Sequence, residues 1–153
     1  MVWKSEKRSF SVTVQPGSPV VVAETPFGRL GLAVCYDLRF PELFRRMLQE
    51  RVEVIALPSA FTAITGRAHW EVLVRARAIE NLCYVVASAQ GGYHANGRET
   101  YGHSMIVDPW GMVMDQLPRG SGVVSSEIDL ARLRDVRRNF PALNHRKISC
   151  EVV

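Results

Sequence analysis

Cysteine is scarce in this chain of 153 residues, and its three copies are far apart. Cys35, Cys83 and Cys150 are odd in number, and no two of them form a C-x-x-C pair. This pattern argues against both a disulfide framework and a zinc site. We therefore expect a protein of a reducing compartment, the cytoplasm, that holds no metal.

Long apolar runs are missing as well. No stretch approaches the ~20 apolar residues of a membrane-spanning helix, and the residues after Met1 lack the apolar segment of a secretory signal. The chain has no internal repeat and no low-complexity segment. Hydrophobic residues nevertheless make up 47% of it, which is enough to build the core of one globular domain. The sequence thus predicts a single domain with no membrane partner.

Acidic residues are outnumbered, 15 against 19 basic ones, which gives a net charge of +4. Part of the excess lies near the C-terminus, where arginines alternate with apolar residues at helical spacing. A nucleic-acid surface would interleave basic residues with exposed aromatic ones. The observed spacing is typical of the solvated or subunit-contacting face of an amphipathic helix, so we expect no nucleic-acid partner. The basic residues concerned are Arg132, Arg134, Arg137, Arg138, Arg146 and Lys147.

Strand-like and helix-like segments alternate through the middle of the chain. The apolar run 30–35 is short and bounded by turn residues, which is typical of a strand buried on both faces. Pro41 and Glu42 suit the first turn of a helix, and 68–82 is rich in good helix formers. The segment 60–67, just before that second helix, contains threonines and a glycine and is expected to be an irregular loop.

Paired strands are expected after this alternation, followed by a final helix. Asp129 is placed to cap that helix, which should run to about Arg138. Alternating strands and helices followed by paired strands predict an α/β domain with a mixed sheet. The predicted strands are residues 19–24, 30–35, 52–57, 83–89, 103–107, 112–117 and 123–128.

Cys35 ends the predicted strand 30–35, and charged residues follow it closely. A strand fixes the backbone of a nucleophile placed at its end, while the turn that follows exposes the side chain. The N–H of Tyr36 would then lie beside the attacked carbonyl, where it is placed to stabilise an oxyanion. The alternative is a small buried core cysteine. The nearby charges of Asp37 and Arg39 argue against that alternative, because charged residues among apolar neighbours usually form ion pairs or take part in function.

The helix expected at 68–82 contains two possible ion pairs. Glu71 and Arg75, and then Arg77 and Glu80, have the spacings at which side chains meet on one helix. The apolar residues around them leave no wide polar face, so we expect a largely buried helix with structural ion pairs. The alternative is an arginine that binds an anion beside a substrate pocket.

Several segments, taken together, resemble the nitrilase superfamily of carbon–nitrogen hydrolases. The similarity is greatest to its Nit-type branch, which includes amidases acting on deaminated glutathione and on omega-amides of dicarboxylates. Residues 16–147 resemble the C-terminal part of the family domain, whereas 1–15 and the tail 148–153 do not resemble it. The matching segments are 31–43, 58–61, 65–66, 68–71, 75–81 and 101–104, with the turn 108–111.

The resemblance implies a four-layer αββα sandwich that assembles into homo-oligomers, of which this chain holds an incomplete half. It implies an amidase that cleaves a small amide through a thioester on Cys35, without a metal or an organic cofactor. In the family a glutamate acts as base and a lysine steadies the tetrahedral intermediate, and both belong upstream of the matching segments. A second glutamate would fall at Phe10. Tyr36, Phe61 and Thr65 are the residues expected to contact the substrate.

Two alternatives stay open at this point. A truncated chain would be inactive, or would serve as a module that binds a full-length partner. A glutaminase-like enzyme would instead pair Cys35 with His69 or His103, although a lone histidine that opens a strand is more often a hydrogen-bonded scaffold residue. Val34 and Tyr36 also stand where a glutaminase elbow has glycines.

Overall fold

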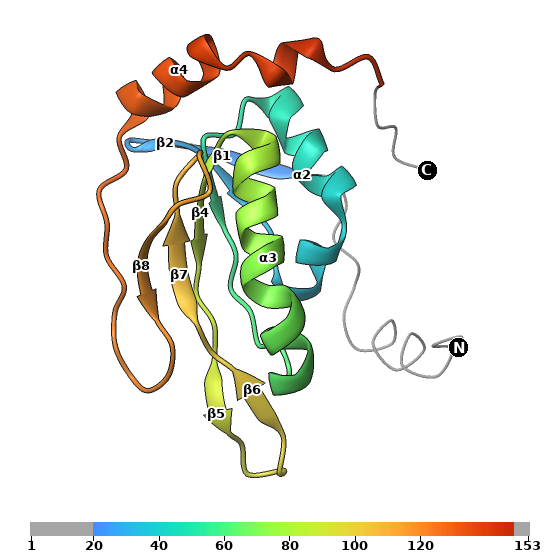
Figure 1. Ribbon diagram of the computed structural model, residues 1–153, viewed down its shortest axis with the longest axis vertical. Helices are drawn as coiled ribbons and strands as arrows, with labels where there is room; N and C mark the ends of the chain where they lie inside the picture. Colours follow the sequence, from blue (N-terminus) through green and yellow to red (C-terminus); the bar gives the residue numbers. More distant parts are fainter. Residues whose placement is uncertain (1–19, 149–153) are drawn as a thin grey trace.

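The computed structural model describes residues 20–148, which form a main sheet with helices packed on it and a separate hairpin (Figure 1). The expected N-terminal segment 1–15, with Phe10, lies outside the described residues, and so does Cys150 in the tail. Within the described range, no helix is both long and apolar enough to cross a membrane.

A six-stranded mixed sheet forms the centre of the structure, in the order β1-β2-β3-β4-β7-β8. β2, β3 and β4 run parallel, whereas β1, β7 and β8 pair antiparallel with their neighbours. A separate hairpin, β5-β6, extends beyond one end of the sheet (Figure 1). The predicted α/β class with a mixed sheet is confirmed. The strands are β1 Val21–Thr25, β2 Gly28–Leu32, β3 Val54–Ala56, β4 Tyr84–Ala87, β5 Gly91–Tyr93, β6 Glu99–Tyr101, β7 Ser104–Val107 and β8 Val113–Leu117.

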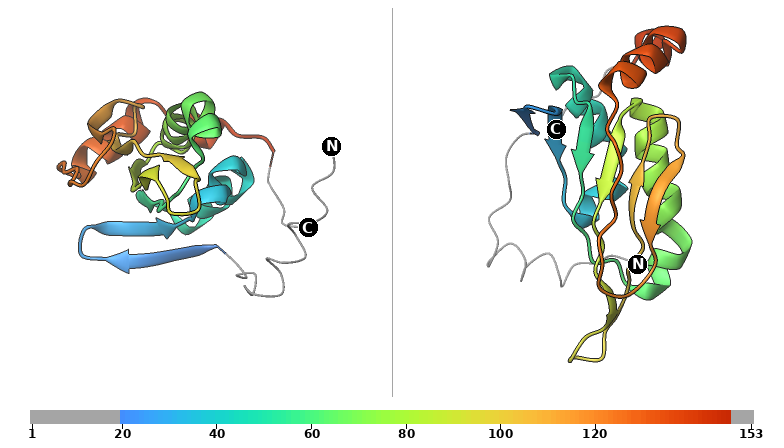
Figure 2. Two further views of the ribbon diagram at one scale, coloured as in Figure 1. Left: turned by 90° about the horizontal axis from the view of Figure 1, so that it is seen from below. Right: turned by 90° about the vertical axis from the view of Figure 1, so that its left-hand side faces the viewer.

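Helices α2 and α3 cover one face of the sheet, and α4 crosses one end of the molecule (Figures 1 and 2). Leu133 of α4 packs against Val54 and Tyr84, whose neighbours Ile55 and Val85 belong to the cluster under α2 and α3. Because side chains alternate along a strand, α4 lies on the opposite face. The helices are α2 Pro41–Met47, α3 Ala63–Asn81 and α4 Leu130–Asn139, with short 3-10 helices η1 Cys35–Arg39, η2 Leu48–Glu50 and η3 Ala142–His145.

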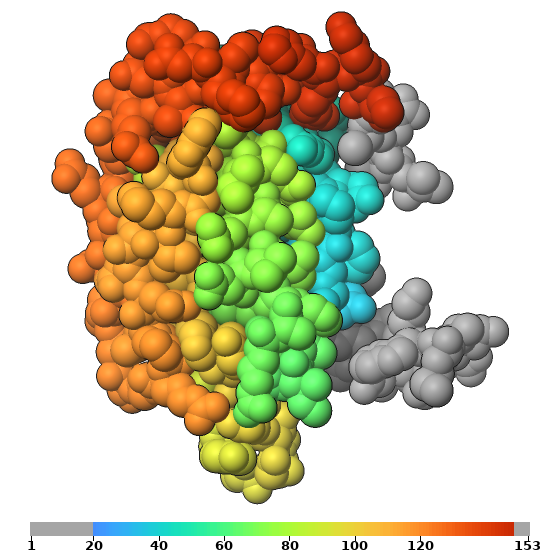
Figure 3. Space-filling model, viewed as in Figure 1, coloured from blue at the N-terminus to red at the C-terminus, as the bar shows by residue number. Residues whose placement is uncertain are grey.

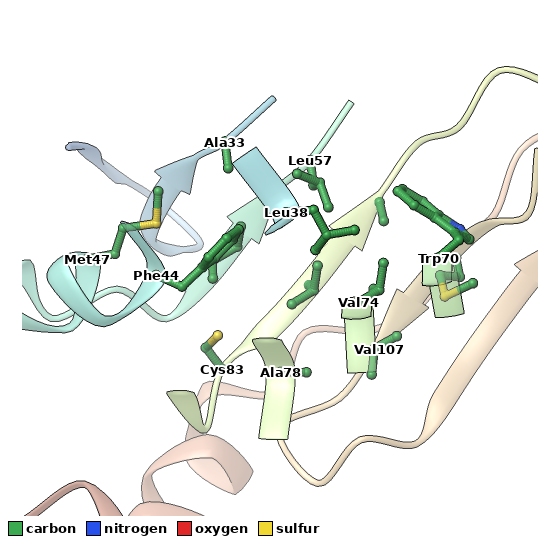
Figure 4. Packing of buried hydrophobic residues seen from close by; sticks show 14 of the residues in the cluster. Ala33, Leu38, Phe44, Met47, Leu57, Trp70, Val74, Ala78, Cys83 and Val107 are labelled. Carbon is green, nitrogen blue, oxygen red and sulfur yellow. The ribbon is translucent and has the colours of Figure 1, made fainter. Parts of the chain in front are cut away.

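The main core lies between the sheet and helices α2 and α3 (Figure 4). Phe44 and Met47 reach it from α2, and Trp70 and Val74 from α3, at spacings that place each pair on one side of its helix. The indole N–H of Trp70 donates to the backbone carbonyl of His103 over 2.7 Å, so the buried ring has its polar atom paired. Burial of one such side chain stabilises a fold by about 1.5–3 kcal/mol. These anchors fix both helices on the sheet.

The strand predicted at 30–35 is shorter than expected and is not buried on both faces. β2 ends at Leu32, and Cys35 already belongs to η1. Ala33 is buried towards the helices, whereas Leu32 and Val34 are 46% and 60% exposed on the other face. The sequence could not reveal this difference, because an apolar run suits a covered face and an uncovered one equally well.

Helix α3 begins at Ala63, inside the segment 60–67 that was predicted to be a loop. The side chain of Thr62 caps the helix by accepting a backbone N–H of its first turn. Gly66 then allows the ring of Tyr101 to lie directly against the helix. A cap and a tertiary contact thus start the helix earlier than residue propensities indicate.

The strand predicted at 123–128 is not formed. The N–H of Ser125 donates to the carboxylate of Asp115 over 2.7 Å instead of to a neighbouring strand. The helix after it was predicted correctly, and the side chain of Asp129 caps it by accepting the N–H of Arg132 over 2.9 Å.

Helix α3 is only partly buried, contrary to expectation. Glu71 and Arg75 approach within 3.6 Å, but their side chains are 48% and 47% exposed. Arg77 and Glu80 pair over 2.9 Å, and the Arg77 side chain is only 6% exposed. The prediction of a buried ion pair was therefore right for Arg77 and wrong for Arg75, because several apolar residues of the helix face outward.

Candidate active site

Cys35 lies where the chain leaves β2 and enters η1, in a backbone conformation that is unusual for a residue with a side chain. Its φ is 46°, in the left-handed region that costs a non-glycine residue about 1–2 kcal/mol. The N–H of Cys35 donates to the carbonyl of Pro58 over 2.9 Å, and the N–H of Val34 donates to the Asp37 carboxylate over 2.8 Å. Strained turns of this kind present the nucleophile in hydrolases that carry it at the end of a strand.

The thiol of Cys35 is half-buried and has a backbone donor against it. The N–H of Ala60 donates to Sγ over 3.5 Å. The carbonyl of Ala60 accepts from the guanidinium of Arg98 in the β5–β6 hairpin over 3.1 Å. The hairpin therefore braces the loop that carries this donor.

A cavity of about 450 Å³ opens beside the thiol. It lies at the carboxyl ends of the parallel strands β2, β3 and β4, because a lining segment follows each of them. Open α/β sheets bind their ligands at this edge, and the volume is in the range of small-molecule sites. The lining residues are Val34, Cys35, Pro58, Ser59, Ala60, Ser88, Ala89, Gln90 and Ser104.

The wall of this cavity is neutral and closely hydrogen-bonded. Ser104 Oγ accepts the N–H of Ala89 over 2.9 Å and donates to its carbonyl over 3.3 Å. The N–H of Ser59 donates to the carbonyl of Ser88 over 2.8 Å. No charged side chain lines the cavity in the part of the chain that the structure describes. The described wall can therefore orient an uncharged group such as an amide, but it supplies neither a base nor an ammonium group.

Of the residues expected around the site, only Cys35 lines the cavity. The side chain of Tyr36 is exposed and that of Phe61 is buried. Both rings contact the guanidinium of Arg39, whose carbon lies 5.6 Å and 4.9 Å from the two ring centroids. Thr65 lies in the first turn of α3, where its hydroxyl bonds to the side chain that caps the helix. The structure thus gathers Tyr36 and Phe61 around Arg39 and places Thr65 at the start of the next helix.

The two histidines considered as partners of the thiol make other contacts. Nδ1 of His69 is 3.2 Å from Nη1 of Arg39. The ring of His103 stacks on Tyr101 with centroids 3.9 Å apart. Neither histidine lines the cavity beside Cys35, so the geometry does not support a cysteine–histidine pair. Among residues 20–148, no three His, Cys, Asp or Glu side chains gather as a metal site.

Four polar residues of the cavity wall were not predicted from the sequence: Ser59, Ser88, Gln90 and Ser104. Serine and glutamine are ordinary loop residues, so their type does not mark them as functional. The signal that finds them is topological. Ser59 and Ser88 follow strands that run parallel to the strand before Cys35, so all three must meet at one edge of the sheet.

A family model of carbon–nitrogen hydrolases matches residues 2–138, a range that includes Cys35 and every segment of the cavity wall. The chain belongs to the carbon–nitrogen hydrolase family. This match confirms the resemblance found in the sequence. The matched range begins at residue 2, before the boundary that the sequence predicts between residues 15 and 16. That boundary stays a prediction.

Related carbon–nitrogen hydrolases share both sequence and fold with the chain. The deaminated glutathione amidase of Homo sapiens is 55% identical over 130 residues, which are 85% of this chain and 39% of that protein. The NitFhit protein of C. elegans has a TM-score of 0.82 at 49% identity, over 87% of this chain and 32% of that one.

A more distant relative is an amidase of the nitrilase superfamily from Nesterenkonia sp. AN1. It has a TM-score of 0.68 at 26% identity, over 84% of this chain and 50% of that one. The structure of a point mutant of this amidase shows the result of Michael addition of acrylamide at the active site cysteine. The chain spans about half the length, or less, of the curated relatives that it matches.

Proposed function

We propose that this chain carries the nucleophile of an amide hydrolase, and that the nucleophile is Cys35. The observation that carries the proposal is the position of this thiol. It is half-buried on a strained turn and opens into a neutral cavity at the carboxyl ends of three parallel strands. In a point mutant of a relative with the same fold, acrylamide adds to the active site cysteine, which is the behaviour of a nucleophilic sulfur.

In the proposed reaction the sulfur of Cys35 bonds to the amide carbon, and the C=O electron pair moves onto oxygen. Collapse of this tetrahedral intermediate breaks the C–N bond. The nitrogen takes up a proton and leaves as an amine or ammonia, and the acyl group stays on sulfur as a thioester. Water then adds to the thioester carbon, the C–S bond breaks, and a carboxylic acid and the free thiol result. This cycle needs a reduced thiol, so we place the protein in a reducing compartment such as the cytoplasm.

The N–H of Tyr36 is the proposed donor to the oxyanion. It has no hydrogen-bond acceptor among residues 20–148, and it follows Cys35 directly, as the oxyanion donor follows the nucleophile in hydrolase elbows. One donor of this kind is typically worth about 10²–10³ in rate.

The base and the lysine of the mechanism are proposed to come from residues outside the described part of the chain. The family resemblance implies a glutamate and a lysine for these tasks, whereas the described cavity wall is neutral. Lys147 is the one lysine within residues 20–148. Glu42, the nearest carboxylate after Cys35 apart from the turn-capping Asp37, lies in the first turn of α2, where it suits the helix dipole.

For the substrate we propose a small amide similar to deaminated glutathione. Relatives that are 47% and 55% identical to this chain are deaminated glutathione amidases. Tyr36, Phe61 and Thr65 are proposed to contact the acyl part of the substrate. The first two are supported by their shared contact with Arg39, four residues after the nucleophile.

The test is to join the chain to the N-terminal part of the Homo sapiens relative and to measure the amine released from deaminated glutathione. We expect the chimera to be active, Cys35→Ala to be inactive, and Cys83→Ala, which alters a core thiol, to keep most of the activity. Full activity of Cys35→Ala would exclude it as the nucleophile. A folded but inactive chimera would favour the alternative of a module that only binds a partner.

We also propose that the protein forms homo-oligomers through the outer side of α3, the face shown in Figure 3. Trp110 and Phe140 are exposed with ring centroids 5.5 Å apart, and Gly111, next to Trp110, lies beside the exposed Ile79 of α3. Exposed apolar patches of this kind mark interfaces. Trp110→Glu should shift sedimentation to a smaller species, whereas Val123→Glu, at an exposed apolar residue of the segment after β8, should not.

A further inference from the structure

A second cavity, of about 330 Å³, shares no lining residue with the one beside Cys35. It lies between the end of α2 with η2 and the segment that follows α4, which crosses that end of the molecule in red in Figures 1 and 3. Three of its lining residues are arginines, namely Arg51, Arg137 and Arg146, and none is acidic. Within residues 20–148, no carboxylate forms a salt bridge with any of the three.

Arg137 is the best-fixed of these three cations. Its Nε donates to the carbonyl of Leu82 over 2.8 Å, and its Nη2 donates to the carbonyl of Val52 over 2.7 Å. Nη1 has no partner among the described residues. Burial lowers the pKa of this guanidinium, because a charge in a poorly solvated place lacks the stabilisation of water, and the nearby Glu53 carboxylate offsets this lowering only in part. Arg137 is thus half-buried and bound to backbone carbonyls, not fully solvated, while the expectation of a subunit-contacting helix face stays a prediction.

Arg51 provides a second, independent observation. It ends η2 with a φ of 56°, in the left-handed conformation that glycine adopts without strain at the ends of helices. An arginine at this place keeps a guanidinium at the rim of the cavity at a cost in backbone strain. Strain that is kept in this way is typical of functional positions.

We propose that this cavity binds a small anion, a phosphate- or carboxylate-bearing molecule whose head group lies between the three guanidinium groups. Arginine matches the oxygens of such groups with paired N–H donors. Gln49 and Asn144 add amide groups to the wall, and Leu48 and Leu143 offer apolar surface to a short organic body. Three like charges around one cavity repel each other, so a bound anion also stabilises the folded chain.

The test is isothermal titration of the 153-residue chain with inorganic phosphate, pyrophosphate and succinate at low ionic strength. We expect at least one anion to bind with a Kd of about 1 mM or below. Arg51→Gln and Arg146→Gln should each weaken binding about tenfold, as the loss of a charge-assisted hydrogen bond does. Arg134→Gln is the matched control, because Arg134 is exposed on α4 and does not line the cavity.

Thermal unfolding distinguishes a lost site from a damaged fold. Arg51→Gly relieves the left-handed strain and removes the charge, so it should raise the Tm of the free chain and reduce the further rise caused by the anion. Binding of phosphate or pyrophosphate but not succinate identifies a phosphorylated ligand, and the reverse identifies a carboxylate. Equal weakening in Arg134→Gln, or no binding of any of the three anions to the folded chain, would overturn the proposal. None of these readouts depends on amide hydrolysis.

Discussion

Arg77 connects the interior of α3 to the turn that carries Cys35. Its guanidinium donates to the carbonyl of Leu38 through Nε over 3.1 Å and through Nη2 over 2.8 Å, and it pairs with Glu80. Arg77→Ala leaves the buried Leu38 carbonyl without its donor and removes the nearer of the two cations of Glu80, whose other ion pair is with Arg45 over 3.8 Å. We expect it to lower the free energy of unfolding by about 3 kcal/mol.

The matched control is Arg75→Ala on the same helix. Its ion pair is half-exposed and its Nε donates to the carbonyl of Gly111 over 2.8 Å, so chemical denaturation should show a smaller loss, of about 1 kcal/mol. Arg77→Ala should also change the rate at which Cys35 is alkylated, because the Leu38 carbonyl belongs to the same turn. Equal losses of stability in the two variants would show that the buried contacts of Arg77 stabilise the fold no more than the exposed contacts of Arg75.

Cys83 gives the stability of the fold a dependence on alkaline pH. Burial raises the pKa of its thiol to about 12, whereas a thiol in an unfolded chain has a pKa of about 8.5. Between these values the unfolded chain loses the thiol proton and the folded chain keeps it. The contribution of this thiol to the free energy of unfolding therefore falls as pH rises, by up to about 1.4 kcal/mol per pH unit. Well below pH 8.5 the thiol makes stability no more dependent on pH.

Denaturation curves measured at increasing pH from 8 to 11 check this prediction. The free energy of unfolding should decline less steeply with pH in Cys83→Ala than in the wild-type chain. Equal slopes in the two proteins would mean that the native thiol ionises as readily as the unfolded one.

The sequence singled out Cys35, the proposed nucleophile, but missed most of the cavity beside it. Cys35 has a local signal, since it ends an apolar run and precedes charged residues within one short segment. Ser59, Ser88 and Gln90 have no such signal, because their role depends on the strands before them lying side by side. Residue type predicts chemistry at a site, whereas strand order decides which plain residues join it.

Within α3, Gly66 shows how a tertiary contact overrides helix propensity. A Cβ at this position would overlap Cβ and Cγ of Tyr101. In an open helix Gly→Ala stabilises by about 1 kcal/mol, but overpacking against an aromatic ring costs about 1–3 kcal/mol. Gly66→Ala should therefore lower the Tm, while Arg67→Ala, at the exposed next position, should leave it almost unchanged. A higher Tm for Gly66→Ala would show that the ring can move aside.

The starts of α2 and α4 could be predicted, whereas the start of α3 and the conformation of the segment 123–128 could not. Pro41 is the first residue of α2 and the Asp129 side chain caps α4, so both signals lie at the helix start itself. The start of α3 depends on the packing of β6 against it, and the backbone near Ser125 bonds to the side chain of Asp115 on β8. Local patterns mark the ends of elements only where no distant contact competes.

For the whole molecule, the neutral cavity wall predicts that the 153-residue chain by itself hydrolyses no amide at a measurable rate. General base catalysis is typically worth about 10²–10⁴ in rate, and the described wall supplies no base. An assay of amine release from deaminated glutathione by the isolated chain should equal the buffer control. Turnover above that control, lost in Cys35→Ala, would show that the chain contains its own base.

The parallel pairing of β2, β3 and β4 sets the order in time in which the molecule forms. Leu30 pairs with Val54, and Val54 with Tyr84, so each pairing must close a long loop that contains a helix. The β1–β2 hairpin can form within about 1–10 microseconds, whereas non-local pairings of this kind form far more slowly. The cavity draws its walls from all three parallel strands and is therefore among the last parts to assemble. A newly made chain thus presents the thiol of Cys35 to its surroundings before it has a site in which to use it.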